Sequence, residues 1–321
     1  MNKINFDYDS NLIKIYRDMK LPIQHTKKPI FHYTSPEGIL GILNSKSLFA
    51  TDLNYLNDKS EGIYGLSLLQ RELNSLLNGK KLLEPYILRE IKEAREDIKN
   101  SYLFHTYTIS FSMDSDLLGM WNYYTKGNSI RGYNIGFNVG KLLNNIHINV
   151  DNENDKKVDL VGEEYLHPVH GKVIYSYDRQ IDILKSIIDE LTEFYDEFIE
   201  SDYKMETLAY FIVRKVLFVS VFFKDECFRQ EQEYRIAFNA TMTAGKEFQQ
   251  KGVPYKELFR VSNGNIVPYQ KCAFAPEAVS SITCSPTLQL QEDITSLKRV
   301  LLYDYKHVQN KINQSKIPVR F

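Results

Sequence analysis

The strongest constraint on the fold is a stretch of eight residues, 231–238, in which side-chain character alternates with a period of two. Gln232, Tyr234, Ile236 and Phe238 form one set, and Glu231, Glu233, Arg235 and Ala237 form the other. Successive side chains of a β-strand point to opposite faces, so this alternation predicts a half-buried strand. The fold must therefore include a sheet.

Other parts of the chain follow a helical period. Apolar residues recur at three- and four-residue steps in four segments, 39–43, 66–77, 83–98 and 187–199, and a final helix is expected over 294–308. Further strands are expected at 29–34, 102–112, 133–139, 173–177 and 279–284. Strands and helices come in blocks rather than in strict alternation, which favours an α+β fold over a doubly wound sheet.

The 321 residues, 43% of them hydrophobic, are enough to bury a sizeable core. No linker-like composition divides the chain, so we expect one elaborated domain over 1–321. It would comprise an N-terminal lead (1–28), a catalytic-like core (29–285) and a C-terminal helical segment (286–321). The 40 Lys and Arg residues against 41 Asp and Glu residues exclude a global positive field for binding nucleic acid.

The N-terminus lacks the basic start and apolar stretch of a signal peptide, and the apolar segment 208–223 is interrupted by Arg214 and Lys215. We therefore expect a cytoplasmic protein without a membrane partner. Three widely spaced cysteines predict neither a disulfide framework nor a structural zinc site. His167 and His170 make a poor metal half-site because Pro168 opposes a helix between them, so no metal ligands are predicted.

Several polar residues are candidates for chemistry. Glu231, Glu233 and Arg235 either form a solvated strand face or combine two carboxylates with a guanidinium that holds them, leaving one carboxylate available for chemistry. His32 precedes a helix start at Ser35-Pro36, where a histidine and backbone N–H groups can meet a ligand, although it can equally be a structural histidine.

The middle of the chain offers hydroxyls and aromatic rings. Ser110 and Ser112 share one face of an expected strand, and Trp121 with Tyr124 could supply a stacking surface. The alternative is a core aromatic cluster with surface serines. No P-loop, GxGxxG or GxSxG motif is present, which argues against the common kinase, Rossmann and α/β-hydrolase classes.

Taken in order, these segments resemble the bacterial family called domain of unknown function 2971. The matching pieces are His32-Tyr33-Thr34 with the helix after it, Asn57-Asp58 with Glu61, Ser110-Phe111-Ser112, Met120-Trp121 with Tyr124, Gly132 to Phe137, and Glu231 to Arg235.

More distantly, the chain is similar to ADP-ribosyltransferases of the His-Tyr-Glu type. That resemblance implies a split β-sheet core with helical insertions, with NAD as the substrate cofactor. It implies Glu233 as the catalytic carboxylate and Glu231 as the contact to the acceptor, an unidentified protein or nucleic acid. The NAD-binding residues would be His32, Tyr33, Thr34, Ser110, Ser112, Trp121, Tyr124 and Arg235.

Three functions follow from these patterns. The first, which the resemblance implies, is an NAD-dependent ADP-ribosyltransferase or NAD glycohydrolase, with a role as a toxin in bacterial defence against phage. The second is a binding module without turnover. The third is a nuclease-like enzyme whose magnesium would be held by Asp58, Glu61, Glu231 and Glu233.

Overall fold

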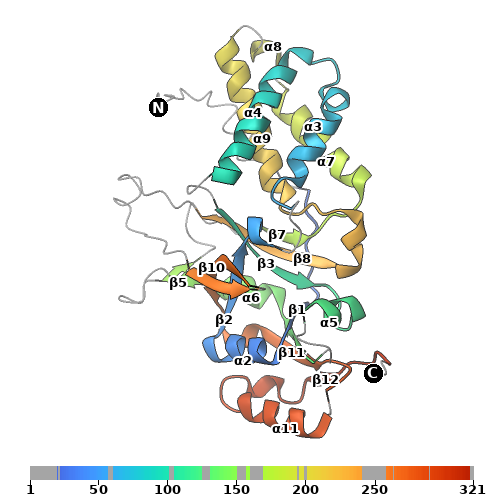
Figure 1. Ribbon diagram of the computed structural model, residues 1–321, viewed down its shortest axis with the longest axis vertical. Helices are drawn as coiled ribbons and strands as arrows, with labels where there is room; N and C mark the ends of the chain where they lie inside the picture. The colour runs from blue at the N-terminus through green and yellow to red at the C-terminus, as the bar shows by residue number, and fades with distance from the viewer. Residues whose placement is uncertain are drawn as a thin grey trace. The chain divides into compact units, whose positions relative to one another are not determined.

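The computed structural model describes residues 20, 22–56, 61–100, 105–124, 131–149, 157–159, 169–193, 195–198, 201–240, 258–262, 264–288 and 290–318 (Figure 1). The chain divides into two compact units. The helical unit comprises Met1–Ile23, Asn57–Ser101 and Ile174–Glu226, and the sheet unit comprises Gln24–Leu56, Tyr102–Val173 and Cys227–Phe321. Both units are assembled from interleaved segments, and the single elaborated domain stays a prediction.

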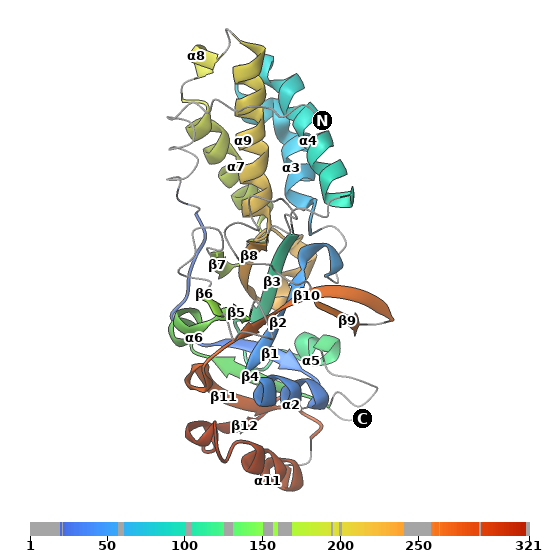
Figure 2. The ribbon, with the colours of Figure 1, turned by 90° about the vertical axis from the view of Figure 1, so that its left-hand side faces the viewer.

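The helical unit is a bundle whose long helices lie side by side in both ribbon views (Figures 1 and 2). Its helices are α3 (Tyr64–Leu77), α4 (Glu84–Asn100), α7 (Tyr177–Leu191), α8 (Tyr195–Phe198) and α9 (Asp202–Ser220). Their apolar stripes share one buried core, as the three- and four-residue period predicted.

Two predictions in this unit need correction. The expected helix 187–199 is the end of α7 followed by the short α8, and the Thr192 hydroxyl between them donates to the Ile188 carbonyl. The expected strand 173–177 is wrong, because Ser176 caps the start of α7.

Glu61 is buried in the helical unit and pairs with Lys224 at 3.1 Å, while residues 57–60 lie outside the described residues. Across the described chain, no helix is long and apolar enough to span a membrane.

The sheet unit contains an open sheet of twelve strands. The strands are β1 (Ile30–Thr34), β2 (Ser47–Asp52), β3 (His105–Ser112), β4 (Tyr133–Phe137), β5 (His147–Asn149), β6 (Lys157–Asp159), β7 (Val169–Lys172), β8 (Glu233–Ala240), β9 (Leu258–Ser262), β10 (Asn265–Ala273), β11 (Val279–Cys284) and β12 (Ile312–Gln314). The main path runs β12-β11-β4-β1-β3-β2-β10-β5-β6, with β8 on β3, β7 on β8 and β9 on β10. The α+β class is confirmed.

Helices cover the sheet according to their sequence patterns. The helices of this unit are α2 (Pro36–Ser45), α5 (Leu118–Tyr124), α6 (Val139–Asn145) and α11 (Leu290–Val300). Apolar residues of α2, α6 and α11 share the main core with strand residues such as Ile109 and Ile236, whereas α5 packs its Met120 and Trp121 around Tyr33 of β1. The Ser35 side chain caps α2 by accepting from the Gly38 N–H at 3.1 Å, as predicted.

The C-terminal part differs from the expected single helix over 294–308. The helix α11 ends at Val300, a turn follows, and β12 then pairs in parallel with β11. The carboxylate of Asp116, near the start of α5, holds this segment by accepting bonds from the Ser315 hydroxyl at 2.5 Å and the Lys316 N–H at 2.7 Å. The two bonds from Asp116 join positions about 200 residues apart in the chain, which local periodicity cannot reveal.

A glycine sets how closely two helices of the bundle approach. A Cβ atom added at Gly65 in α3 would lie 2.2 Å from the Cβ of Ser220 in α9, whereas one added at Gly41 in α2 meets nothing within 4 Å. We therefore expect Gly65→Ala to lower the free energy of unfolding by about 1–3 kcal/mol through overpacking. The control Gly41→Ala should raise it by about 0.5–1 kcal/mol because alanine favours a helix interior. Urea unfolding of both variants measures this, and equal effects would contradict the close contact.

Candidate functional site

The candidate site lies where β3 pairs with three other strands, β1, β2 and β8. The strand β8 pairs with β3 over its whole length, from His105↔Ala240 to Ser112↔Glu233. Therefore β1 and β2 share the other edge of β3, where β1 pairs at Ser112 and β2 at Thr108 and Tyr107. The strands β1 and β2 thus diverge and form a fork along β3.

His32 occupies the fork. Its Nδ1 lies 3.0 Å from the carbonyl oxygen of Ser110, and because a carbonyl can only accept, Nδ1 carries the proton. Burial is the main cause that lowers the pKa of His32 below 6.5, and the positive charge of Arg260 lowers it further, while the Ser110 carbonyl opposes the shift. His32 is therefore neutral near pH 7, and its Nε2 keeps a lone pair that can accept a hydrogen bond.

The two candidate carboxylates reach the pocket by different routes. Glu233 is the first residue of β8, but Glu231 ends a 3-10 helix (Glu226–Glu231) and is not part of the strand. Between them Gln232 adopts a left-handed backbone conformation with φ of 47°. The prediction that Glu231 extends the strand is therefore wrong, because the left-handed residue breaks the alternation before β8 begins.

The turn that carries Glu231 is fastened to β3. The Ser112 hydroxyl donates to the Glu231 carbonyl at 2.9 Å, and the Met113 N–H donates to the Gln232 carbonyl at 2.8 Å. Ser112 also accepts from the Asp114 N–H, and its side chain is fully buried. Ser112 thus holds the wall of the site and does not line the pocket.

Glu233 is held from one side by a buried guanidinium. Arg235 Nε lies 2.6 Å from Glu233 Oε1, and Arg235 Nη2 lies 2.8 Å from Oε2. Arg235 and Glu233 expose only 1% and 5% of their surface, so the polar row is not a solvated strand face. Each carboxylate oxygen has a second lone pair, so the paired Glu233 can still accept a bond from a ligand.

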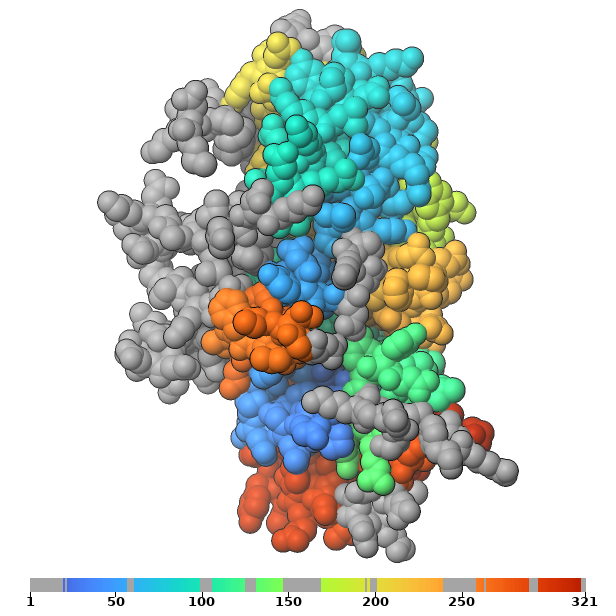
Figure 3. All heavy atoms as spheres, viewed as in Figure 1, coloured from blue at the N-terminus to red at the C-terminus, as the bar shows by residue number. Residues whose placement is uncertain are grey.

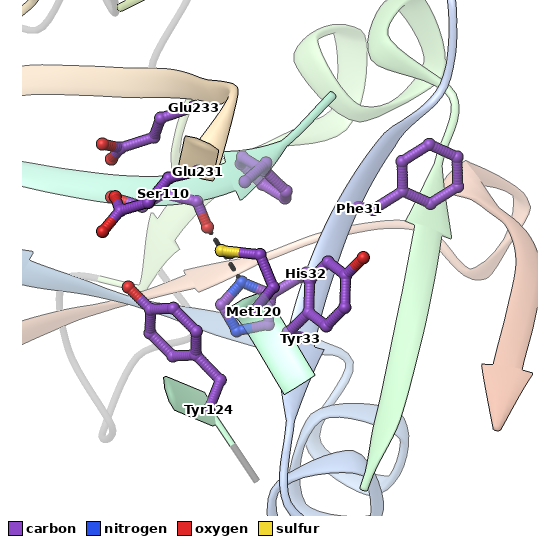
Figure 4. Close-up of a pocket in the computed structure, with 9 residues that line it drawn as sticks. Phe31, His32, Tyr33, Ser110, Met120, Tyr124, Glu231 and Glu233 are labelled. Atoms are coloured by element: carbon purple, nitrogen blue, oxygen red, sulfur yellow. Dashed lines mark hydrogen bonds between the residues drawn. The ribbon is translucent and has the colours of Figure 1, made fainter. Parts of the chain in front are cut away.

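A pocket collects most of the predicted residues (Figure 4). The lining side chains come from β1, β3, α5 and the turn into β8: Phe31, His32, Tyr33, Ser110, Phe111, Met120, Tyr124, Glu231 and Glu233. The space between them, counted with the solvent that opens onto it, is about 280 Å³. In the close-up, the Tyr124 hydroxyl points toward the Glu231 carboxylate.

Four predicted binding residues lie outside this lining. Trp121 is fully buried behind Tyr33, with ring centroids 4.7 Å apart, and its Nε1 donates to Asp116 at 2.9 Å. Thr34 packs against the start of α2, where it lies next to Gly38. Ser112 and Arg235 have the supporting contacts described above. Phe31 and Phe111 line the pocket but were not predicted, because a strand phenylalanine carries no signal that separates a pocket wall from core.

The described residues contain no group of three or more His, Cys, Asp or Glu side chains placed to hold a metal ion. Asp58, one of the proposed magnesium ligands, is outside them, as is His167. His170 lies in β7, with its Nδ1 2.6 Å from the Tyr234 hydroxyl and its ring 4.5 Å from that of His25. Burial, helped by the charge of His25, lowers the pKa of His170 to about 4.

The lowered pKa of His32 predicts a pH dependence of stability. Below pH 6.5 the unfolded chain takes up a proton that folded His32 resists, so its contribution to stability is present above pH 6.5 and is lost as the pH falls through the folded pKa. We expect Tm to fall less between pH 7 and pH 5 in His32→Asn, whose amide can still donate to Ser110, than in the wild type. Scanning calorimetry at both pH values tests this, and parallel decreases in the two proteins would rule out this role of His32.

Comparison with family models gives a match over part of the chain. No curated protein and no solved structure shows significant similarity to the chain. Residues 120–236, which run from α5 through the helical unit to β8 and include the Glu231 and Glu233 turn, match the family described as "Protein of unknown function (DUF2971)".

Proposed function

We propose that the protein is an NAD-dependent ADP-ribosyltransferase or an NAD glycohydrolase, with Glu233 as its catalytic carboxylate. The observation that supports this most is the convergence of His32, Glu231 and Glu233 on one pocket, although His32 is about 200 positions from the two carboxylates in the chain. The divergence of β1 and β2 along β3 also supports the proposal, because the resemblance to that superfamily implies a split sheet.

The chemistry requires what this pocket offers. Breaking the bond between nicotinamide and ribose produces an oxocarbenium-like cation, and a fixed carboxylate stabilises such a charge. Arg235 holds both oxygens of Glu233, which orients the carboxylate before a substrate arrives. The lone pair on His32 Nε2 can accept a hydrogen bond from a ribose hydroxyl. The aromatic side chains of the pocket can pack against the nicotinamide ring. Glu231 is then placed to meet the acceptor.

The decisive test compares two isosteric substitutions. Glu233→Gln should reduce nicotinamide release from NAD by roughly a hundredfold, which corresponds to on the order of 3 kcal/mol of transition-state stabilisation. Glu231→Gln should reduce transfer to an acceptor in a cell extract more than it reduces NAD hydrolysis. Both activities can be followed with labelled NAD in the presence of a chelator, which should have no effect. Wild-type turnover by folded Glu233→Gln would falsify the catalytic role of Glu233.

The ion pair complicates this test, because Glu233→Gln leaves the buried Arg235 without its anion. Loss of one partner of a buried pair destabilises a fold by about 3–5 kcal/mol. Activity is therefore compared at a temperature where circular dichroism shows the variant to be folded. The double variant Glu233→Gln/Arg235→Gln removes both charges, and it should recover part of the stability but none of the activity.

The same ion pair favours a second candidate, a binding module without turnover. A carboxylate whose two oxygens are already held by arginine is suited to accept ligand hydroxyls without carrying out chemistry. This alternative predicts that NAD or a related ligand binds with no release of nicotinamide, in the presence or absence of a chelator and of cell extract.

A further inference from the structure

A second cationic side chain, Arg260, lies on the sheet close to the fork. It is in β9, which pairs with β10, and β10 pairs with β2 through Tyr269↔Thr51. Residues opposite each other in antiparallel strands share a face, so these pairings place Arg260 on the same face as Thr51. The Arg260 Nη2 donates to the Thr51 hydroxyl at 2.9 Å. The strands β9 and β10, orange in Figure 3, are at the surface in that view.

Two aromatic rings border the guanidinium. Its Cζ lies 5.7 Å from the ring centroid of Phe49 and 6.0 Å from that of Tyr269, and the two rings are 4.3 Å apart. Phe49 is 41% exposed. A ligand can therefore reach a flat apolar surface directly beside a positive charge.

The charge of Arg260 has no carboxylate beside it in the part of the chain that the structure describes. Its hydrogen-bond acceptor is the neutral Thr51 hydroxyl, and its buried Nε has no acceptor among the residues that the structure describes. Burial lowers the pKa of Arg260 below its usual value, because desolvation disfavours the charged form. A partly buried guanidinium with unused N–H donors is the group that proteins use to bind phosphate and carboxylate.

The sheet register connects Arg260 with the pocket. Thr51 lies opposite Thr108 of β3, and Ser110 follows two residues later on the same face. The Thr108 hydroxyl between them is buried without a partner among the described residues. The charge of Arg260 also reaches His32, where it lowers the pKa. One ligand lying along β3 could therefore contact Glu233 and Arg260 together.

We propose that Arg260, Thr51 and the rings of Phe49 and Tyr269 form a subsite for the diphosphate of a nucleotide whose reacting end lies in the pocket. This rests on the proposed function for the identity of the reacting end. The guanidinium receives the phosphoryl oxygens, and the exposed ring of Phe49 meets the base.

The test uses ADP and adenosine as probes, which differ only in the diphosphate. In calorimetric titrations the wild type should bind ADP more tightly than adenosine. Arg260→Gln should weaken ADP binding at least tenfold and leave adenosine binding unchanged. Arg260→Lys, which keeps the charge but loses the fork of donors, should give an intermediate loss. The control Arg299→Gln removes the same charge from an exposed position on α11 and should bind ADP like the wild type.

Nicotinamide release separates the subsite from the proposed function. Wild-type ADP affinity in Arg260→Gln, with its KM for NAD unchanged, overturns the subsite while the function stands. Loss of ADP affinity specific to Arg260, in a protein whose wild type releases no nicotinamide, supports the subsite and overturns the function. Equal weakening by Arg260→Gln and Arg299→Gln overturns the subsite, because it reflects net charge alone. Thermal melts of each variant identify any loss that is due to unfolding.

Discussion

A β-strand has two hydrogen-bonding edges, and the site exists because β3 has three neighbours. Since β8 takes one edge completely, β1 and β2 must divide the other, and neither can pair with the backbone around Ser110. A buried carbonyl left without a partner is costly, and the imidazole of His32 supplies the missing donor. The same geometric conflict thus creates the opening and fixes the tautomer of the histidine within it.

The site also has to keep two carboxylates, those of Glu231 and Glu233, buried among largely apolar side chains. Glu231 and Glu233 expose only 9% and 5% of their surface, and a buried carboxylate is tolerated only where its charge is matched. The bidentate contact from Arg235 meets this need for Glu233. Glu233 lies opposite Ser112 of β3, and the Ser112 hydroxyl donates to the Glu231 carbonyl. The end of β3 therefore positions both glutamates.

Sequence periodicity predicted the parts of the fold that depend on local burial. The capped helix after Ser35, the strand 30–34 and the helices α3 and α4 match closely, because one apolar face decides each of them. The site was predicted as a set of residues rather than as a geometry. His32, Ser110, Tyr124 and the two glutamates do meet, but the roles of Ser112 and Trp121 depend on partners that no local pattern specifies. Arg260 carried no signal at all, because a single arginine in a strand resembles any solvated residue.

The left-handed backbone at Gln232 has a consequence for how related chains can be compared. Because this residue separates the 3-10 helix that ends at Glu231 from β8, the spacing between Glu231 and Glu233 does not reflect the two-residue repeat of a strand. A left-handed conformation costs a residue with a side chain roughly 1 kcal/mol, and glycine or asparagine adopts it more easily. In a relative with either residue at this position, the Glu-x-Glu motif can keep the same turn, whereas an inserted residue would shift Glu231 away from the anchoring hydroxyl of Ser112. The middle residue of the motif is therefore the position that reports whether an aligned pair of glutamates shares this geometry.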